Sequence, residues 1–324
     1  IRRYPVRHDP VANGIPADRY PYLGSKLVAR FAEETLYGLG SKADQVVFPN
    51  YFLPPATPRI RQASAFIMDV QHRVFPQFFG AAKVRWMDMT IAHMLRKADR
   101  VLFISQFEFE QTQRFFGSAF ADRGRVVHVA IDWTRFAEEP ARPDLLPIGD
   151  RPFILSVSQQ YPHKRLDLLL RAFAKLARRD PDVALVLTGR PAPGLLDAAR
   201  SELDADAAGR IHFAGFVSDA ELGHLYRRTS VFALPSVYEG FGMPAVEALS
   251  FGNPALLTDS TAVPEATMGL AHYLPSEAGP DEWADALGEM VRNPRTIAPA
   301  QVAALRARYE PVTIAGRLRR ALND

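Results

Sequence analysis

The sequence predicts an α/β protein with two domains, each built on a parallel sheet. From residue 153 onward, short apolar runs alternate with segments of helical periodicity, a pattern that favours parallel strands with helices on both faces of the sheet. The chain has 324 residues, which suits two ordinary domains better than one core. Residues 138–150 are rich in proline and charge and lack periodicity, so we expect domains at 1–145 and 146–324.

The second domain is a regular succession of elements. In its first helix, apolar residues on one stripe would pack on the sheet: Leu166, Leu169, Leu170, Phe173 and Leu176. We expect the last helix of the chain to pack back on the first domain. The expected strands are 153–157, 184–189, 211–215, 231–235 and 255–259, and the expected helices are 164–178, 193–203, 219–228, 244–251 and 281–292.

The first domain is less regular but has the same two kinds of segment. We expect strands at 46–49, 65–70, 100–105 and 125–130, and helices at 25–39, 81–97 and 106–116.

The composition is that of a globular protein and limits the possible functions. Hydrophobic residues make up 48% and charged residues 23%, and no apolar run approaches the roughly 18 residues of a membrane span. The absence of cysteine excludes disulfides and thiolate chemistry and fits a reducing compartment, so we expect a cytoplasmic location. A net charge of +3 falls short of a nucleic-acid footprint, so we expect no nucleic-acid partner.

The segment 235–247, Pro-Ser-Val-Tyr-Glu-Gly-Phe-Gly-Met-Pro-Ala-Val-Glu, carries a glycine-rich turn that opens into a helix. Pro244 suits the first turn of a helix. The backbone amides of Phe241, Gly242 and Met243 would then be free to bind an anion, which the helix dipole and the glycines favour. The sequence therefore predicts a phosphate site at this turn.

Two carboxylates flank the predicted phosphate site. Glu239 precedes it and Glu247 lies one turn inside the helix, so each can accept hydrogen bonds from hydroxyls on either side of a phosphate. A nucleotide joined to a sugar has that arrangement. The alternative is a helix whose acidic residues only stabilise its dipole.

Several further motifs accompany the 239–247 motif: His-Lys-Arg at 163–165, Leu-Leu-Leu-Arg-Ala-Phe at 168–173, Phe-Ala-Gly-Phe-Val-Ser-Asp at 213–219, Leu-Gly-His-Leu-Tyr at 222–226, Val-Pro-Glu at 263–265, and the segments 69–79, 98–105 and 126–132. Taken together, these segments resemble the retaining nucleotide-sugar glycosyltransferases of family 4, a hexosyltransferase family. The resemblance is strongest over 153–292 and weaker over 44–133. It implies the GT-B fold, with two Rossmann-like domains whose parallel sheets face each other across a cleft.

The resemblance assigns roles to the motif residues. It implies that Glu239 contacts hydroxyls of the donor sugar and that Glu247 binds the ribose diol. It also makes Lys164 the phosphate-binding cation, and a cation at a helix start independently favours an anion beside it. The alternative for Lys164 is a solvated surface cation.

The phosphate clamp departs from the family pattern. The family usually carries an arginine several residues before its lysine, where this chain has Ser158. The second cation is therefore either missing or supplied by Arg165 or Arg190, and we expect Ser158 near the phosphates. Gly215 and Val217 resemble the loop that borders the nucleobase, although Gly215 equally suits a plain turn.

In the first domain the resemblance points to the region around Met68. Relatives place a histidine there and use it near the donor sugar, whereas this chain offers His72 close by. We expect His72 to take over that position and Asp69 to orient sugar or acceptor hydroxyls. The alternative for His72 is a packed residue beside an aromatic cluster.

The expected chemistry needs no metal or other cofactor. Asp204-Ala-Asp206 has the spelling of a divalent-metal motif, but we interpret these aspartates as the solvated end of a helix. The family retains anomeric configuration by same-face attack, with the leaving phosphate taking the acceptor proton. No protein nucleophile is then required.

The sequence also favours a particular donor and a class of acceptor. We prefer GDP-mannose, because segment 71–76 is similar to bacterial polysaccharide mannosyltransferases, and UDP-glucose or a UDP-N-acetylhexosamine remains an alternative. We expect a glycan or lipid-linked saccharide as acceptor. Segment 74–89 mixes basic and bulky apolar residues, which fits peripheral contact with the inner face of the membrane; the alternative is that these aromatics form core.

Residues 1–43 contain no strand followed by a glycine-rich loop, with which the family's fold begins. We therefore expect the first domain to lack its first strands, in a shortened chain or a compact variant. A third explanation is a protein that binds nucleotide sugar without transferring it. A sugar-nucleotide epimerase of the same architecture is a further alternative.

Overall fold

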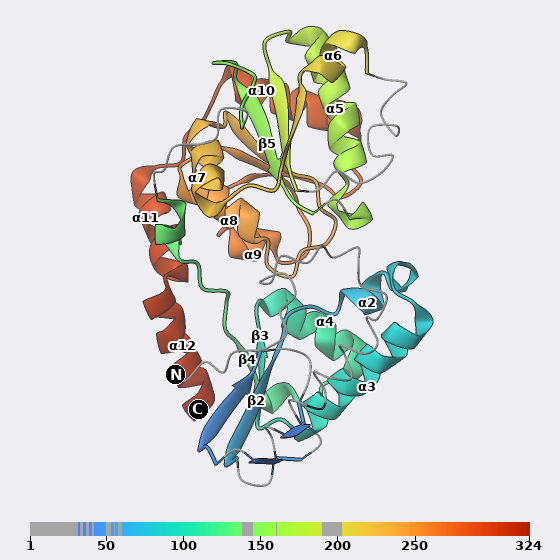
Figure 1. Cartoon of the computed structure of the whole chain (residues 1–324), viewed down its shortest axis with the longest axis vertical. Helices are drawn as coiled ribbons and strands as arrows, with labels where there is room; N and C mark the ends of the chain where they lie inside the picture. Colours follow the sequence, from blue (N-terminus) through green and yellow to red (C-terminus); the bar gives the residue numbers. More distant parts are fainter. Residues whose placement is uncertain are drawn as a thin grey trace.

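The computed structural model describes residues 42–49, 60–137, 145–159, 161–189 and 203–324, together with a few positions between 32 and 57. Its strands form two sheets, and every pairing within them is parallel. The sheets lie in two lobes, one above the other in Figure 1. The expected α/β class with two parallel sheets is confirmed.

The first sheet has the order β1-β2-β3-β4. Strand β2 starts and ends three residues before the expected strand, so Asp69 lies in the loop that follows it. The helices pack a core around Ile67, Phe103 and Met94. The elements are β1 (Gln45–Phe48), β2 (Gln62–Ile67), β3 (Arg100–Phe103) and β4 (Gly124–Val126), with α2 (Gln71–Val74), η2 (Pro76–Phe78), α3 (Ala81–Lys97), α4 (Gln106–Phe116), η3 (Ala121–Arg123) and η4 (Trp133–Phe136).

The second sheet has the order β10-β9-β8-β5-β6-β7. The sequence missed β10, which has three residues and begins with the exposed His272. The elements are β5 (Phe153–Val157), β6 (Ala184–Thr188), β7 (Ile211–Gly215), β8 (Val231–Leu234), β9 (Ala255–Thr258) and β10 (His272–Leu274), with η5 (Pro162–Lys164), α5 (Leu166–Arg179), α6 (Ala205–Gly209), α7 (Asp219–Arg228), α8 (Met243–Ser250), α9 (Val263–Ala266) and α10 (Pro280–Arg292).

Successive residues along the strands of the second sheet pack alternately into two hydrophobic cores, one on each face. Ile154 and Val231 point into a cluster with Leu169 and Phe173 of α5 and Trp283 of α10. The neighbouring residues of the same strands point to the other face, where α7 and α8 cover them. Burial on both faces explains why these strands appear in the sequence as short apolar runs.

The order of the second sheet determines where its site lies. Strand β5 pairs with β6 on one side and β8 on the other, so the winding reverses between β5 and β8. Ligands of open parallel sheets bind in the crevice at the carboxyl ends of the strands at such a reversal. The loop after β5 leads to Lys164 and the loop after β8 leads to Glu239, so the fold brings the two segments together.

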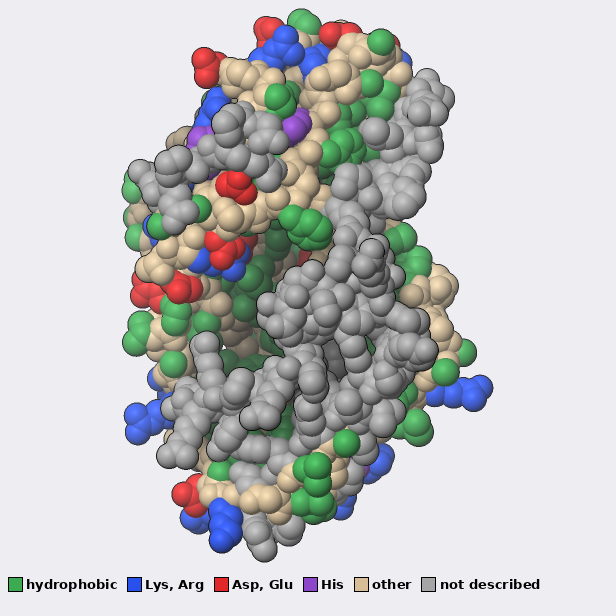
Figure 2. Space-filling model, viewed as in Figure 1, with side chains coloured by type: hydrophobic (Ala, Val, Ile, Leu, Met, Phe, Trp, Pro, Cys, Tyr) green, Lys and Arg blue, Asp and Glu red, His purple; other side chains and the backbone are tan. Residues whose placement is uncertain are grey.

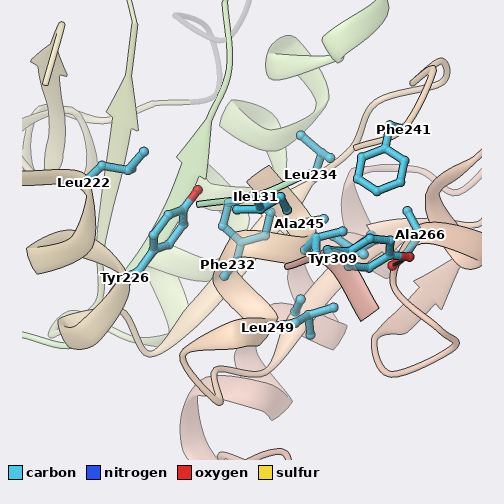
Figure 3. Packing of buried hydrophobic residues seen from close by; sticks show 14 of the residues in the cluster. Ile131, Leu222, Tyr226, Phe232, Leu234, Phe241, Ala245, Leu249, Ala266 and Tyr309 are labelled. Carbon is cyan, nitrogen blue, oxygen red and sulfur yellow. Dashed lines mark hydrogen bonds between the residues drawn. The ribbon is translucent and has the colours of Figure 1, made fainter. Parts of the chain in front are cut away.

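The chain ends in two helices that join the lobes. Helices α11 (Pro299–Tyr309) and α12 (Pro311–Asn323) run down one side of the molecule in Figure 1. Near the end of α12, the carbonyl oxygen of Leu322 accepts a hydrogen bond of 2.7 Å from Nε2 of Gln62 on β2. Tyr309 packs its ring on Phe241 with centroids 5.2 Å apart and donates to the carbonyl oxygen of Ala266 at 2.7 Å (Figure 3).

Two local expectations are wrong. The helix expected from 164 begins at Leu166, because Arg165 adopts a left-handed conformation (φ 50°) that separates it from the preceding 3₁₀ turn. Asp204 does not end a helix; its side chain caps the start of α6 by accepting from the Ala207 amide at 2.8 Å. The expected helix 193–203 lies outside the described residues except at its last position, and the expected helix 25–39 does so for most of its length.

Among the described residues, no helix is both long and apolar enough to cross a membrane. On the face seen in Figure 2, acidic and basic side chains are interspersed where the side chains are described.

Candidate active site

A cavity of about 310 Å³ opens at the reversal point of the second sheet. Three of the predicted site residues line it: Lys164, Glu239 and Ser158. Gln71 of α2 completes the wall, so the cavity lies between the two lobes. Its lining is Gln71, Val157, Ser158, Gln159, Tyr161, His163, Lys164, Glu239 and Pro244.

Lys164 and Glu239 form the charged part of this cavity. The Nζ atom of Lys164 lies 2.7 Å from Oε1 of Glu239, and their side chains are 16% and 11% exposed. The backbone amide of Glu239 donates to Oγ1 of Thr261 at 3.0 Å, which fixes the loop that carries the carboxylate. The pair thus presents a cation and a hydrogen-bond acceptor to the same space, the groups that a phosphate and a sugar hydroxyl require.

The start of α8 borders the cavity through Pro244. Gly242 caps this helix in the left-handed conformation (φ 87°), which a side chain would disfavour. No described residue accepts a hydrogen bond from the amides of Phe241, Gly242 or Met243. The turn therefore has the free donors that an anion site at a helix start uses.

Glu247 lies one turn deeper and does not line the cavity. It is 2% exposed, and its carboxylate accepts from Nη2 of Arg135 at 3.0 Å and from the Tyr226 hydroxyl at 2.9 Å. Burial raises the pKa of Glu247, while the Arg135 guanidinium and the Tyr226 hydroxyl oppose that rise. Sequence reasoning missed both partners, because Arg135 belongs to η4, near the linker, and Tyr226 to α7.

The expected nucleobase loop lies next to this group. Gly215 ends β7 with φ 67°, and Val217 precedes α7, whose first residue is Asp219. The Nε atom of Arg135 lies 3.6 Å from Oδ1 of Asp219. Arg135 thus links the end of the 215–219 loop to Glu247.

The structure does not bring His72 into the cavity. The ring is fully buried, and its Nε2 atom lies 3.0 Å from Oδ1 of Asp88 on α3, which also pairs with Arg73 at 2.8 Å. Burial lowers the pKa of His72. The packed alternative therefore describes its surroundings best. Asp69 accepts from the Gln71 amide at 3.1 Å, and Gln71 is the residue of this loop that reaches the cavity.

His163 is a cavity residue that the sequence did not single out as a site. Its Nδ1 atom lies 3.1 Å from Nε2 of Gln71. The ring stacks between Phe75 and Tyr161, with centroids 6.1 and 5.8 Å away. Burial, and then the charge of Lys164, lowers the pKa of His163 to about 4, so the imidazole is neutral at ordinary pH. The stack joins η5 to the other lobe.

The expected second phosphate cation is not in the lining. Arg165 lies beside its own helix, with Nε 4.0 Å from Oδ1 of Asp167. Arg190 lies outside the described residues. Ser158 does line the cavity, and its buried hydroxyl has no hydrogen-bond partner among the described groups.

No group of three or more His, Cys, Asp or Glu side chains in the described part of the chain could hold a metal ion. Asp206 pairs with Arg210 at 2.8 Å. A larger hollow of about 590 Å³ lies between the end of α8 and α11, but its only charged lining residue is Arg306 and it holds none of the predicted site residues.

Two known proteins similar in sequence are mannosyltransferases by name. The chain is similar to O-antigen chain mannosyltransferase B of Escherichia coli, with 28% identity over 226 residues, covering 67% of this chain and 57% of that protein. It is also similar to GDP-mannose-dependent alpha-(1-6)-phosphatidylinositol monomannoside mannosyltransferase of Mycolicibacterium smegmatis, with 30% identity over 240 residues, covering 68% and 62%. The chain thus spans less than two thirds of the length of either relative.

Solved structures of similar fold are more distant in sequence. Sucrose-phosphate synthase from Thermosynechococcus elongatus superposes with a TM-score of 0.72 at 19% identity, covering 95% of this chain and 80% of that one. WaaG, a glycosyltransferase involved in lipopolysaccharide biosynthesis, gives 0.67 at 15% identity, covering 92% and 81%. The expected GT-B fold is confirmed.

The family described as glycosyl transferases group 1 matches residues 138–307. This segment is more than half of the chain and carries Lys164, Glu239 and Glu247. The chain belongs to the glycosyl transferases group 1 family.

Proposed function

We propose that this protein transfers a hexose from a nucleotide-diphosphate sugar to a glycan or lipid-linked saccharide. The observation that carries the proposal is the Lys164–Glu239 pair, 2.7 Å apart in a cavity that Pro244 at the start of α8 also lines. The names of the relatives support glycosyl transfer, and two of them support a mannosyl donor.

The groups of the cavity suit the charge that develops during transfer. As the bond between the anomeric carbon and the phosphate oxygen breaks, negative charge grows on the leaving diphosphate. Lys164 and the amides of Gly242 and Met243 would neutralise it. Glu239 then accepts hydrogen bonds from the sugar hydroxyls, which orients the anomeric carbon.

We propose that transfer retains the anomeric configuration and needs no metal ion. The acceptor hydroxyl attacks from the face that the phosphate leaves, a bond forms between its oxygen and the anomeric carbon, and its proton passes to the leaving phosphate oxygen. No cofactor takes part. The pairing of Asp206 with Arg210 supports a structural role for the Asp204–Asp206 segment.

The remaining donor contacts are proposed by position. Glu247 would bind the ribose diol and Gly215 and Val217 would border the base. This requires the nucleoside to share Glu247 with Arg135, which already contacts it. Ser158 would face the phosphates, whereas Arg165, with Nε 4.0 Å from Asp167, would have to turn toward them.

GDP-mannose is the proposed donor, in line with the name of one relative. Other relatives are named D-inositol 3-phosphate glycosyltransferases, and a structural neighbour was solved with UDP and glucose. UDP-glucose and UDP-N-acetylglucosamine therefore belong in the test.

Peripheral contact of the protein with the inner face of the membrane is proposed through segment 74–89. Phe78 and Met89 are 45% and 64% exposed there, and Lys83 and Arg85 are exposed nearby. Such a surface suits anionic lipid. Sedimentation with anionic vesicles should be lost on changing Phe78 and Met89 to serine, and binding that persists in this variant would contradict the assignment.

The test of the function is calorimetric titration in EDTA with GDP-mannose, UDP-glucose, UDP-N-acetylglucosamine, GDP and UDP, followed by product analysis with a saccharide acceptor. Tight binding of one base series, lost in Lys164→Met but kept in Lys175→Met, is expected. Lys175 is the matched control because it pairs with Asp281 on the surface of the same lobe. Binding without transfer would indicate a binding protein, and isomerised nucleotide sugar would indicate an epimerase.

A further inference from the structure

Glu108, a buried carboxyl that the proposed chemistry does not use, lies where the two lobes meet. Its helix, α4, is capped by Ser105, whose Oγ accepts from the Glu108 amide at 3.2 Å. The same hydroxyl donates to the carbonyl oxygen of Gly240 at 2.8 Å. The start of α4 is therefore docked on the loop of the second lobe that carries Glu239.

The Glu108 side chain binds both lobes at once. Its Oε1 atom accepts from the Tyr238 hydroxyl at 2.7 Å, and its Oε2 atom accepts from the Val70 amide at 3.1 Å. Tyr238 immediately precedes Glu239, and Val70 immediately precedes Gln71. One carboxyl thus joins the two loops that supply opposite walls of the cavity.

The packing around this carboxyl is tight. Glu108 and Tyr238 are 0% and 3% exposed, and the Tyr238 ring meets Phe107 edge-on with centroids 5.8 Å apart. A Cβ atom on Gly240 would lie 2.8 Å from the carbonyl oxygen of Met68 and 3.3 Å from Oε1 of Glu108. The two loops therefore meet in one closely defined arrangement.

A contribution to stability does not explain why a carboxyl group is buried at this position. Burying an ionisable group is costly, and apolar side chains of similar volume often serve a core as well or better. Two directed hydrogen bonds, by contrast, fix the relative position of two loops more narrowly than apolar contact does. The geometry points to a role in positioning.

We propose that Glu108 is a positioning residue that sets the separation of Glu239 and Gln71 across the cavity by holding Tyr238 and the Val70 amide. The inference rests on the proposed function, since the two loops are taken to present donor and acceptor to each other. Glu108 itself would contact neither the donor nor the acceptor. Loss of the bridge lets the lobes meet in several arrangements, of which few are reactive.

The test uses Tyr238→Phe, Glu108→Gln and the double variant in the full chain. Activity is assayed above about pH 8, where Glu108 is ionised. Tyr238→Phe removes only the hydroxyl, and under these conditions Glu108→Gln keeps the size of the side chain but turns one acceptor oxygen into a donor. Tyr273→Phe is the matched control, because its hydroxyl is also hydrogen-bonded, to Thr267 at 2.6 Å, but lies away from the cavity.

The expected result is a fall in kcat on the order of 10²-fold, the size of effect that a misplacement of about 1 Å causes, while the donor dissociation constant changes little. The double variant should lose no more than the worse single variant, because both changes break one bridge. Tyr273→Phe should keep kcat. Losses that multiply in the double variant, or a kcat kept within twofold in both single variants, would overturn the proposal.

Hydrogen exchange separates failure of this inference from failure of the proposed function, because it needs no turnover. In Tyr238→Phe, a change in the second lobe, amides at 68–72 in the first lobe should exchange faster than in the wild type. Unchanged exchange at 68–72 would refute the bridge even in an active enzyme. If exchange is faster in Tyr238→Phe but the wild-type chain transfers no sugar, the proposed bridge is supported and the proposed function is refuted.

Discussion

Lys164 and Glu239 hold each other in the cavity, with Nζ donating to Oε1 across 2.7 Å. Each therefore satisfies the other before any ligand enters. A diphosphate that draws the ammonium away frees the carboxylate for sugar hydroxyls. Removing one partner leaves the other largely buried and unpaired, whereas removing both does not.

We therefore expect stability and activity to separate in these variants. Lys164→Met and Glu239→Leu should each lower the free energy of unfolding by about 1–3 kcal/mol, the usual cost of an unpaired buried polar group. The double variant should recover part of this loss but none of the sugar transfer. Denaturant unfolding and transfer assays on all three variants check this, and a double variant with transfer activity would contradict it.

The second expectation concerns Arg135, 3.0 Å from Glu247. Burial raises the pKa of Glu247 and Arg135 opposes that rise, so Arg135→Met should raise this pKa further. A protonated Glu247 accepts fewer hydrogen bonds from a ribose diol. As the pH is lowered, the variant should therefore lose nucleotide affinity at a higher pH than the wild type does. Titration calorimetry at several pH values would measure this.

The control for this change is Arg179→Met, which removes a guanidinium that pairs with Asp285 on the exposed surface. Its pH profile should match the wild type. If Arg135→Met binds nucleotide with an unshifted pH profile, Glu247 does not contact the ribose through its ionised form.

The sequence predicted the elements that periodicity and glycine encode locally. Strand β8, the turn at Gly242 and helix α8 could be foreseen, because their signals lie within a few residues of each other. The pairing of Glu247 could not, since Arg135 lies 112 residues earlier in the chain. His72 shows the same limit: Asp88, whose carboxylate its ring contacts, is on another helix.

Gly240 offers a third test, because the first lobe leaves no room for a side chain there. A Cβ atom would lie 2.8 Å from the backbone oxygen of Met68, which cannot swing aside as a side chain can. Gly240→Ala should separate the lobes and lower kcat. Gly209→Ala, at a position with open space around it, is the control. Small-angle scattering should report a larger radius of gyration than that of the wild type for Gly240→Ala but not for Gly209→Ala. A radius equal to that of the wild type in Gly240→Ala would show that the lobes accommodate the methyl group without moving apart.

The last expectation is a pH dependence that belongs to Glu108. Burial raises its pKa from 4.5 to about 8, with Asp69 adding to the rise and the Tyr238 hydroxyl and the Val70 amide opposing it. Between these values the folded state keeps a proton that the unfolded state has lost. The free energy of unfolding contributed by this group therefore falls as pH rises, by at most about 1.4 kcal/mol per pH unit.

Glu108→Gln removes this titration, so its stability relative to the wild type should improve steadily from about pH 5 to about pH 8. Denaturant unfolding at several pH values measures the difference. Glu110→Gln, an exposed position on the same helix, should show no such trend. A constant difference between Glu108→Gln and the wild type would mean that Glu108 ionises as easily in the folded chain as in the unfolded one, and that the bridge to Tyr238 and Val70 carries a full charge throughout.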